Sequence, residues 1–496
     1  MDVRVAFRTL GCKLNQLESE SLADAFRRAG ARIGAFESEA ELYVLNTCTV
    51  TSKAEQKARR LVRQALALNP EAVVLVTGCY AQMEPAAIEA LGERAVVVPG
   101  DEKAALLGLA SHLSEYWQGH GRLLDAVLEW RLGLEGESGG QEGGGRAGGA
   151  DRFAFRPESF SFHSRPSLKI QDGCDNRCTY CRVCLARGPS TSLPATEVLS
   201  RLRALEEAGA AEAVLTGVNL SQYRDGSLGF PGLLRLLLSG TERIALRVSS
   251  YEPDKVDEAF LAAFAEPRVR PHAHLPIQSG SDPVLARMGR AYRRDAVLAA
   301  CEGLRRAKGD LFLAADLIVG FPGETDADFA QTLELAKAAD LAWIHAFPFS
   351  PRPGTKAWDM SGRVPERIAG ERAAALGELA RKGRAAYVER WLGAEVDAVL
   401  ESGGERDEEE GALAEGAVVV GGAGGDAAES ASLGRAQGRP ARYATSANYL
   451  KLRVEGLPEA QALKPGAAIR CRLQAGSGEG VLPLADADAR AEFLHS

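Results

Sequence analysis

The amino-terminal part of the chain alternates between short apolar runs and segments in which apolar residues recur at helical spacing. Apolar runs at residues 3–7, 42–45 and 73–76 predict strands, and helical patterns at about 17–29, 52–68 and 84–90 predict the helices between and after them. Strands that alternate with helices form a parallel sheet. We therefore expect residues 1–130 to form an α/β domain with a parallel sheet.

The same alternation returns in the middle of the chain, where it is more regular. Strands are predicted near 167–170, 212–216, 244–249, 270–275, 311–318 and 341–348, and helices near 195–208, 231–239, 254–265, 292–308 and 325–339. Six β/α units predict an incomplete version of the barrel whose active sites lie at the carboxyl ends of its strands. We place this partial (β/α)6 barrel in residues 156–388.

The helical pattern stops near residue 390, and short strands are predicted near 395–400, 417–420, 449–454 and 468–473. They predict a small β-barrel over residues 389–475, with an acidic insertion at 401–430 and a tail at 476–496. Nine glycines in residues 133–149 predict a flexible linker, which we place at 131–155 between the first two domains.

A length of 496 residues fits roughly three domains of the usual size, about 150 residues each. The hydrophobic content of 46% and charged content of 25% are typical of a globular protein in water. We see no signal peptide and no apolar run near the ~18 residues that a membrane span requires. The sequence therefore predicts a cytoplasmic protein without a membrane partner.

The net charge of −8 argues at first against a nucleic-acid partner, but its distribution changes that interpretation. Residues 401–430 hold nine acidic and one basic residue, so the rest of the chain is neutral overall. Two basic clusters then stand out: Lys53, Lys57, Arg59, Arg60 and Arg63, and later Arg435, Arg439, Arg442, Lys451 and Arg453. Local basic patches suffice for phosphate contact, although solvated surface charge explains either cluster equally well.

Three of the nine cysteines, Cys174, Cys178 and Cys181, lie on one short loop in a C-x-x-x-C-x-x-C spacing. Thiolates are soft ligands that suit iron–sulfur clusters or zinc. Three thiolates on a cluster of four irons leave one iron open to a small molecule. Cys184 follows at C-x-x-C spacing, so a four-thiolate zinc site is the alternative.

Three further cysteines, Cys12, Cys48 and Cys79, each follow one of the predicted amino-terminal strands. The carboxyl ends of parallel strands lie along one edge of a sheet, where open α/β folds bind their ligands. Lone cysteines are more often inert core residues. Three at equivalent strand ends, each beside Gly, Thr or Asn, instead predict a second three-thiolate cluster site.

The loop at 170–181 resembles the cluster loop of the radical S-adenosylmethionine (SAM) enzymes, and the order of motifs along the chain resembles the methylthiotransferases among them. The motifs that carry the resemblance are residues 9–15, 46–51, 78–82, 275–280 and 349–355, together with the cluster loop. The resemblance extends from residue 3 to about 474, apart from the Gly-rich linker and the acidic insertion.

This resemblance implies two [4Fe–4S] clusters and SAM as cofactors, with Cys174, Cys178 and Cys181 holding the radical SAM cluster and Cys12, Cys48 and Cys79 the auxiliary cluster. It implies that the carboxyl-terminal barrel is a TRAM-like RNA-binding domain. Strand ends of the central barrel supply expected SAM contacts from Gly217, Asn219, Ser249 and Gln278. The expected tRNA contacts are Arg59, Arg60, Arg439, Arg442, Lys451 and Arg453. An electron donor such as flavodoxin or ferredoxin is a further expected partner.

Within the family, Gly11–Asn15 and Asn46–Thr51 resemble the branch that acts on tRNA carrying N6-threonylcarbamoyladenosine. The implied reaction is radical addition of a methylthio group to carbon 2 of this adenosine at position 37, in the anticodon loop. Two alternatives in the family are isopentenyladenosine in tRNA and a ribosomal-protein aspartate. A non-catalytic iron–sulfur or zinc RNA-binding protein is an alternative of another class. Cys184 departs from the family pattern, and we interpret it as a spectator thiol.

Overall fold

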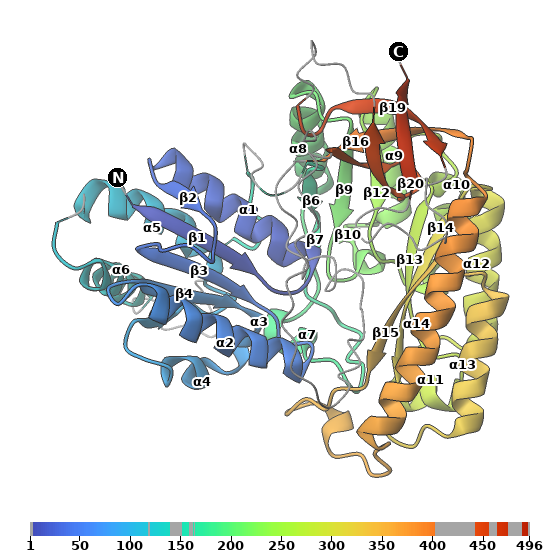
Figure 1. Cartoon of the computed structure of the whole chain (residues 1–496), viewed down its shortest axis with the longest axis horizontal. Coiled ribbons are helices and arrows are strands. Elements are labelled where there is room, and N and C mark those ends of the chain that lie inside the picture. The colour runs from blue at the N-terminus through green and yellow to red at the C-terminus, as the bar shows by residue number, and fades with distance from the viewer. Residues whose placement is uncertain are drawn as a thin grey trace, which may run out of the picture.

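The structure is a computed structural model, and it describes residues 3–117, 120–138, 151–157, 162, 164–401, 442–455, 464–474 and 489–494. These residues form an amino-terminal α/β domain, a central partial barrel and a small closed β-barrel, as Figure 1 shows. The predicted fold class is therefore confirmed. The predicted strand at 417–420, residues 402–430 of the acidic insertion and residues 139–150 of the linker lie outside the described residues.

A five-stranded parallel sheet in the order β2-β1-β3-β4-β5 forms the amino-terminal domain. Its strands are β1 (Arg4–Thr9), β2 (Arg32–Gly34), β3 (Leu42–Thr47), β4 (Val73–Gly78) and β5 (Ala95–Val97). Helices α1 (Lys13–Arg28), α5 (Leu106–His112) and α6 (Leu123–Ser138) cover one face, and α2 (Ser52–Leu68), α3 (Cys79–Met83) and α4 (Pro85–Glu89) cover the other. Every residue of β3 and β4 is buried, which explains their continuous apolar runs.

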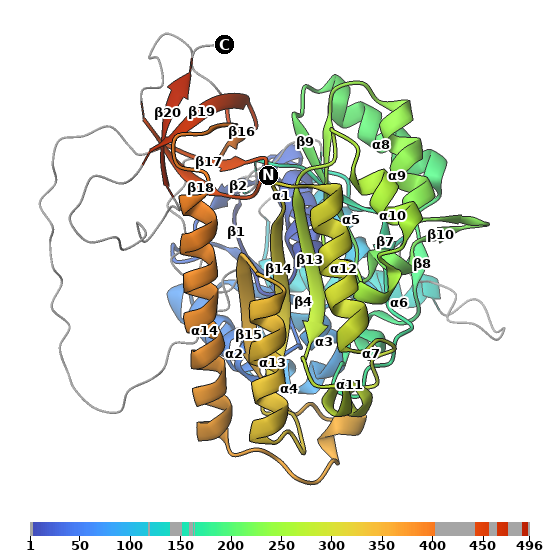
Figure 2. The ribbon, with the colours of Figure 1, turned by 90° about the vertical axis from the view of Figure 1, so that its right-hand side faces the viewer.

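The central domain holds six parallel strands in the order β6-β9-β12-β13-β14-β15, with isolated bridges joining β12 to β13. The strands are β6 (Ser167–Lys169), β9 (Glu212–Thr216), β12 (Ala245–Val248), β13 (His272–Gln278), β14 (Phe312–Val319) and β15 (Trp343–Pro348). Helices α8 (Ala195–Glu207), α9 (Phe230–Gly240), α10 (Glu258–Phe264), α12 (Arg294–Ala307), α13 (Asp326–Ala338) and α14 (Glu366–Glu389) lie outside them, as Figure 2 shows.

Short elements surround the cysteine loop that follows β6. They are the antiparallel pair β7 (Gln171–Asp172) and β8 (Thr191–Ser192), the ribbon β10 (Arg224–Asp225) and β11 (Leu228–Gly229), and helices α7 (Val183–Arg187) and α11 (Asp282–Met288). The predicted linker also differs in part from the structure, because α6 continues helical to Ser138. Among the described residues, no helix has the length and apolar character needed to cross a membrane.

The carboxyl-terminal barrel is closed, in the order β16-β17-β18-β20-β19. Its strands are β16 (Glu395–Leu400), β17 (Arg442–Ser446), β18 (Lys451–Glu455), β19 (Ala468–Gln474) and β20 (Ala489–Leu494). The last strand lies in the residues predicted to be a tail, so the barrel extends beyond the expected boundary at residue 475. Its core is continuous with Phe312 and Tyr387 of the central domain, which fixes it at the amino ends of the barrel strands.

Candidate metal centres and active site

The structure brings Cys12, Cys48 and Cys79 to one edge of the amino-terminal sheet, after β1, β3 and β4. Gly11 has φ +108°, and a Cβ there would lie 2.8 Å from Cys48 Cβ and 3.1 Å from Cys48 Sγ, so only glycine lets these loops approach. Gly78 has φ +96° and packs directly on the backbone of Thr47. The thiols of Cys12 and Cys79 both act electrostatically on Cys48.

Cys174, Cys178 and Cys181 lie together on the loop after β7. Backbone hydrogen bonds shape this loop: Cys174 N–H donates to Gly188 O over 3.1 Å, and Cys181 N–H donates to Cys178 O over 3.1 Å. Thr179 N–H donates to the carbonyl of Met288 over 3.0 Å, which anchors the loop to the end of α11. The thiols of Cys174 and Cys178 act electrostatically on Cys181, so the loop curls around a common centre.

Several donors point at the sulfurs of these cysteines. Arg290 Nη1 donates to Cys178 Sγ over 3.1 Å, Asn219 Nδ2 to Cys174 Sγ over 3.9 Å, Val183 N–H to Cys181 Sγ over 3.4 Å and Val50 N–H to Cys48 Sγ over 3.4 Å. Burial raises the pKa of Cys48 and of Cys181 to about 12, so these thiols ionise readily only when a cation binds them. Each of the two sets therefore has three thiols and at least one hydrogen-bond donor to a sulfur. This arrangement fits one iron–sulfur cluster at each set.

Cys184 lies close to the second set but turns to another partner. Its thiol donates a hydrogen bond to the carbonyl of Cys181, with the sulfur 3.8 Å from that oxygen. It is held on the first turn of α7, behind the three cysteines in sequence. This placement supports the interpretation of Cys184 as a spectator thiol.

A buried network of charges joins the amino-terminal domain to the central barrel. Arg187 of α7 donates to Asn15 Oδ1 over 2.7 Å, to Glu18 Oε1 over 3.2 Å and to Asp172 Oδ1 over 3.0 Å. Glu18 also pairs with Lys103 at 2.5 Å and Lys169 at 3.0 Å, and these cations hold its pKa well below the usual range. Cys79 and this network line a cavity of about 250 Å³.

A second set of contacts crosses the same interface. Arg182, the residue after Cys181, lies 3.4 Å from Glu55 and 2.9 Å from Glu84, and Arg352 also pairs with Glu55. Glu55 belongs to α2, which begins shortly after Cys48. The two cysteine sets are therefore held on opposite sides of one domain interface.

The residues predicted to contact SAM lie at strand ends beside the cysteine loop. Gly217 packs against Gln171, and a Cβ there would lie 2.8 Å from Gln171 Oε1. Asn219 reaches Cys174, Ser249 has a buried hydroxyl without a hydrogen-bond partner among the described residues, and Gln278 ends β13 with φ +69°. Their contacts with SAM stay a prediction.

Two charged residues in this region were not predicted from the sequence. Glu252 and Arg290 form a buried ion pair beside the cysteine loop, and Glu252 also accepts from Asn176 over 3.0 Å. Burial raises the pKa of Glu252 to about 7 despite the opposing effect of Arg290. Glu252 lies after the end of β12 and Arg290 lies after the end of α11, and nothing in their local sequence distinguishes them from surface charges.

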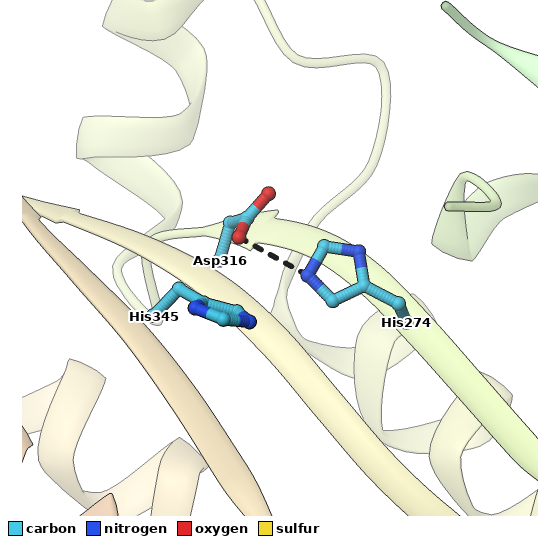
Figure 3. Close-up of side chains that lie close together, drawn as sticks. All are labelled: His274, Asp316 and His345. Atoms are coloured by element: carbon cyan, nitrogen blue, oxygen red, sulfur yellow. Dashed lines mark hydrogen bonds and ion pairs between the residues drawn. The ribbon is translucent and has the colours of Figure 1, made fainter. Parts of the chain in front are cut away.

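A polar cluster lies inside the barrel, formed by His274, Asp316 and His345 of the adjacent strands β13, β14 and β15 (Figure 3). His274 Nε2 lies 3.1 Å from Asp316 Oδ1, and Ser250 Oγ lies 2.8 Å from His274 Nδ1. One potential ligand atom from each of the three residues lies within 4.8 Å of the others, so they could share a cation. The sequence signal was weak: Asp316 is the one charged residue in the apolar strand β14, His345 the one histidine in β15, and His274 one of two histidines in β13.

Those predicted tRNA-binding residues whose side chains the structure describes lie on two separate elements, α2 and β18. Arg59 donates to Tyr80 Oη over 2.6 Å on α2, where Arg60 is exposed. Lys451 pairs with Glu401 at 3.0 Å, and Arg453 is half-buried on β18. Arg439 and the side chain of Arg442 lie outside the described residues. Figures 1 and 2 both show α2 and the carboxyl-terminal barrel in separate parts of the molecule.

Comparison with protein-family models places this geometry among known proteins. Residues 4–100 match the family described as Uncharacterized protein family UPF0004, and residues 168–336 match the Radical SAM superfamily. The two matches cover the two parts of the chain that carry the cysteine sets.

Curated relatives match over most of the chain. A threonylcarbamoyladenosine tRNA methylthiotransferase MtaB of Treponema pallidum is 46% identical over 437 residues, covering 80% of this chain and 91% of the relative. The protein of that name from Bacillus subtilis is 34% identical, covering 82% and 86%. A tRNA-2-methylthio-N(6)-dimethylallyladenosine synthase of Maricaulis maris is 31% identical, covering 81% and 87%. With such identity over nearly the full length of its relatives, this chain belongs to the radical SAM methylthiotransferase family, in its MtaB branch.

Proposed function

We propose that this enzyme adds a methylthio group to carbon 2 of N6-threonylcarbamoyladenosine at position 37 of tRNA. The names of the relatives with 46% and 34% identity support this substrate over the dimethylallyl one, whose synthase is 31% identical. The observation that carries the proposal is the pair of three-cysteine sets across one domain interface. Membership of this enzyme family excludes the non-catalytic alternative.

As a radical SAM methylthiotransferase, the enzyme uses SAM and two [4Fe–4S] clusters. Cys174, Cys178 and Cys181 would hold the radical SAM cluster, and Cys12, Cys48 and Cys79 the auxiliary one. Bound together, these cofactors supply a carbon-centred radical and the methylthio group, which no side-chain acid or base could supply at an aromatic C–H. The protein positions and shields them.

The positioning follows from the contacts at the interface. The pair of Arg187 and Glu18 joins helix α7, which follows Cys174, Cys178 and Cys181, to helix α1, which begins at the residue after Cys12. Such buried ion pairs are lost only at a large free-energy cost, about 3–5 kcal/mol when one partner is removed. The network therefore holds the two domains that carry the cysteine sets in one relative position.

A tRNA anticodon loop is single-stranded, so its base 37 can enter a pocket without opening a duplex. We further propose that Arg60 of α2 and Arg453 of β18 contact the RNA backbone, and that a flavodoxin or ferredoxin supplies the electron. The separation of α2 from the carboxyl-terminal barrel would suit an extended RNA better than a single nucleoside.

The test is a substrate panel with anaerobically reconstituted enzyme, SAM, sulfide and dithionite. Three tRNAs carry threonylcarbamoyladenosine, isopentenyladenosine or unmodified adenosine at position 37, and the nucleosides are analysed by mass spectrometry. We expect methylthiolation of the first alone, its loss in Cys178→Ala and Cys48→Ala, and its retention in Cys184→Ala. Modification of the isopentenyl tRNA alone would contradict the proposal.

A further inference from the structure

A lysine at the start of α1 reaches into the central barrel. Lys13 follows Cys12 directly, and its Nζ lies 6.0 Å from the centre of the Tyr449 ring. Tyr449 in turn packs on His272 of β13, with ring centres 4.2 Å apart. Lys13 also acts electrostatically on His272 and on His345 of β15. The lysine therefore lies between a cysteine of the auxiliary set and the polar cluster of the barrel.

The charge of Lys13 has no carboxylate partner in the part of the chain that the structure describes. Its cationic neighbours Arg165, Arg247 and Lys451 are compensated, because the first two share Glu212 and the third pairs with Glu401. Burial lowers the pKa of Lys13, and the charge of the Tyr449 phenol opposes this shift. A half-buried cation among other cations favours binding of an anion.

The neighbouring imidazole of His345 offers a neutral hydrogen-bond donor. Trp343 Nε1–H donates to His345 Nδ1 over 3.3 Å, and an indole nitrogen can only donate. Burial, with Lys13 contributing, lowers the pKa of His345 to about 4, so the ring is neutral and carries its proton on Nε2. His345 Nε2–H is therefore available as a donor to a ligand.

The third group is an acceptor held in place by its neighbour. With Asp316 ionised, His274 Nε2–H donates to Asp316 Oδ1 (Figure 3). Ser250 then donates to His274 Nδ1. This arrangement leaves Asp316 Oδ2 without a hydrogen bond from any residue that the structure describes. The barrel interior thus presents a neutral donor and a carboxylate acceptor near the ammonium group of Lys13, the residue that follows Cys12.

We propose that Lys13 and His345 bind the carboxylate of the substrate's threonyl group, and that Asp316 accepts a hydrogen bond from the hydroxyl of the same threonyl group. The proposal rests on the function proposed above, and it makes this site the determinant of specificity within the family. An isopentenyl group carries neither a charge nor a hydroxyl, so it would leave Lys13 and Asp316 unpaired at a cost. Lys13 is a binding residue here and takes no part in the radical step.

The test compares two anticodon stem-loops, one with threonylcarbamoyladenosine at position 37 and one with its methyl ester, which lacks only the charge. The variants are Lys13→Gln, Lys13→Arg and His345→Phe. The matched control is Lys451→Gln, which removes a lysine 5.8 Å from the same Tyr449 ring but already paired with Glu401. The readouts are kcat and KM for methylthiolation, and the iron content of each variant.

We expect wild type to prefer the free carboxylate substrate over the methyl ester by about tenfold or more in kcat/KM. This factor corresponds to the free energy of one charge-assisted hydrogen bond. Lys13→Gln should raise KM for the acid by about tenfold and leave the ester within about twofold, so the preference disappears while iron stays at about eight per chain. Lys13→Arg should retain part of the preference, and His345→Phe should reduce it. Lys451→Gln should change both substrates alike.

Equal turnover of acid and ester by wild type would overturn this inference and leave the proposed function standing. An equal fall of kcat/KM for both substrates in Lys13→Gln would overturn it as well, because Lys13 would then be only a structural contact of Tyr449. Stoichiometric zinc in wild type that His345→Phe removes would assign the cluster to a metal instead. Failure of the proposed function itself would differ, because neither threonylcarbamoyl substrate would then react.

Discussion

The guanidinium of Arg290 donates a hydrogen bond to the sulfur of Cys178 over 3.1 Å and pairs on its other side with Glu252. A cation at a cluster ligand offsets the negative charge that the cluster gains on reduction, and so raises its potential. Glu252 fixes the guanidinium in this position. With Cys178 as a ligand of the radical SAM cluster, as proposed above, this pair would control how readily that cluster accepts an electron.

Arg290→Gln should lower the midpoint potential of this cluster by about 60 mV or more, the equivalent of about 1.4 kcal/mol for one electron. The measurement is a redox titration followed by electron paramagnetic resonance, in a Cys48→Ala background that lacks the second cluster. The control is Arg305→Gln on α12, because this arginine donates to the backbone carbonyls of Ala339 and Asp340, far in sequence from the cysteine loop. An unchanged potential in Arg290→Gln would contradict the assigned role.

Gly11→Ala should abolish the auxiliary cluster alone. The added Cβ would lie 2.8 Å from Cys48 Cβ, and φ +108° is strained for alanine, so Cys12 and Cys48 must separate. We expect about four irons per chain instead of about eight, with deoxyadenosine release retained and methylthiolation lost. Gly34→Ala is the matched control in the same sheet, since nothing lies within 4 Å of its Cβ position. Full iron content in Gly11→Ala would refute this account of the site.

Glu212→Gln should weaken the attachment of the carboxyl-terminal barrel. Glu212 is buried against Arg247 at 2.6 Å, and Arg247 also donates to the carbonyls of Ser446 and Ala447. The substitution leaves a buried guanidinium uncompensated, which typically costs about 3–5 kcal/mol. Urea unfolding at pH 7 measures this loss, and the exposed pair of Glu378 and Arg381 provides the control Glu378→Gln, which should leave the midpoint unchanged.

The same residue gives a pH dependence of known sign. Burial alone would raise the pKa of Glu212, but Arg247 and the neighbouring Arg165 and Arg270 lower it to about 2, below its usual value of 4.5. Its contribution to the free energy of unfolding is therefore complete above about pH 4.5 and disappears as the pH falls toward 2. Thermal unfolding of the cluster-free chain between pH 6 and pH 2.5 should show this loss in wild type and not in Glu212→Gln. Parallel curves for the two proteins would contradict it.

Arg60→Glu should weaken tRNA binding for every tRNA to a similar extent. Arg60 lies exposed on α2, within the first basic cluster of the sequence. A lost phosphate contact should reduce the slope of log affinity against log salt by about 1 unit. Arg235→Glu, an exposed arginine of α9 on the central barrel, is the control and should bind as wild type does. An unchanged salt slope in Arg60→Glu would remove α2 from the RNA-binding surface.

Most of the fold could be predicted because its strands are continuous apolar runs. Buried strands such as β3 and β4 follow directly from such runs. Strands β2 and β5 were missed because each has three residues, too few for a periodic signal. Helices α5 and α6 were missed as well. The last strand, β20, was placed in the tail, because its strand character depends on pairing with β18 and β19 in the closed barrel.

The site was predictable only where its residues share a local motif. The six cysteines lie in such motifs, and the structure gathers them in two groups of three; their roles as ligands stay a prediction. The charged network could not be predicted, because its partners are remote: Arg187 and Asn15 lie 172 residues apart. Lys13 was part of a motif typical of the branch, but its position beside the barrel interior required the fold.

The most direct test of the central claim is the iron content of four proteins reconstituted anaerobically, with Mössbauer spectra to identify the cluster type. If the two clusters are independent, wild type and Cys184→Ala should each hold about eight irons per chain. Cys12→Ala and Cys178→Ala should each hold about four. Loss of iron in Cys184→Ala, or zinc in place of iron in wild type, would contradict two three-cysteine cluster sites facing each other across the interface.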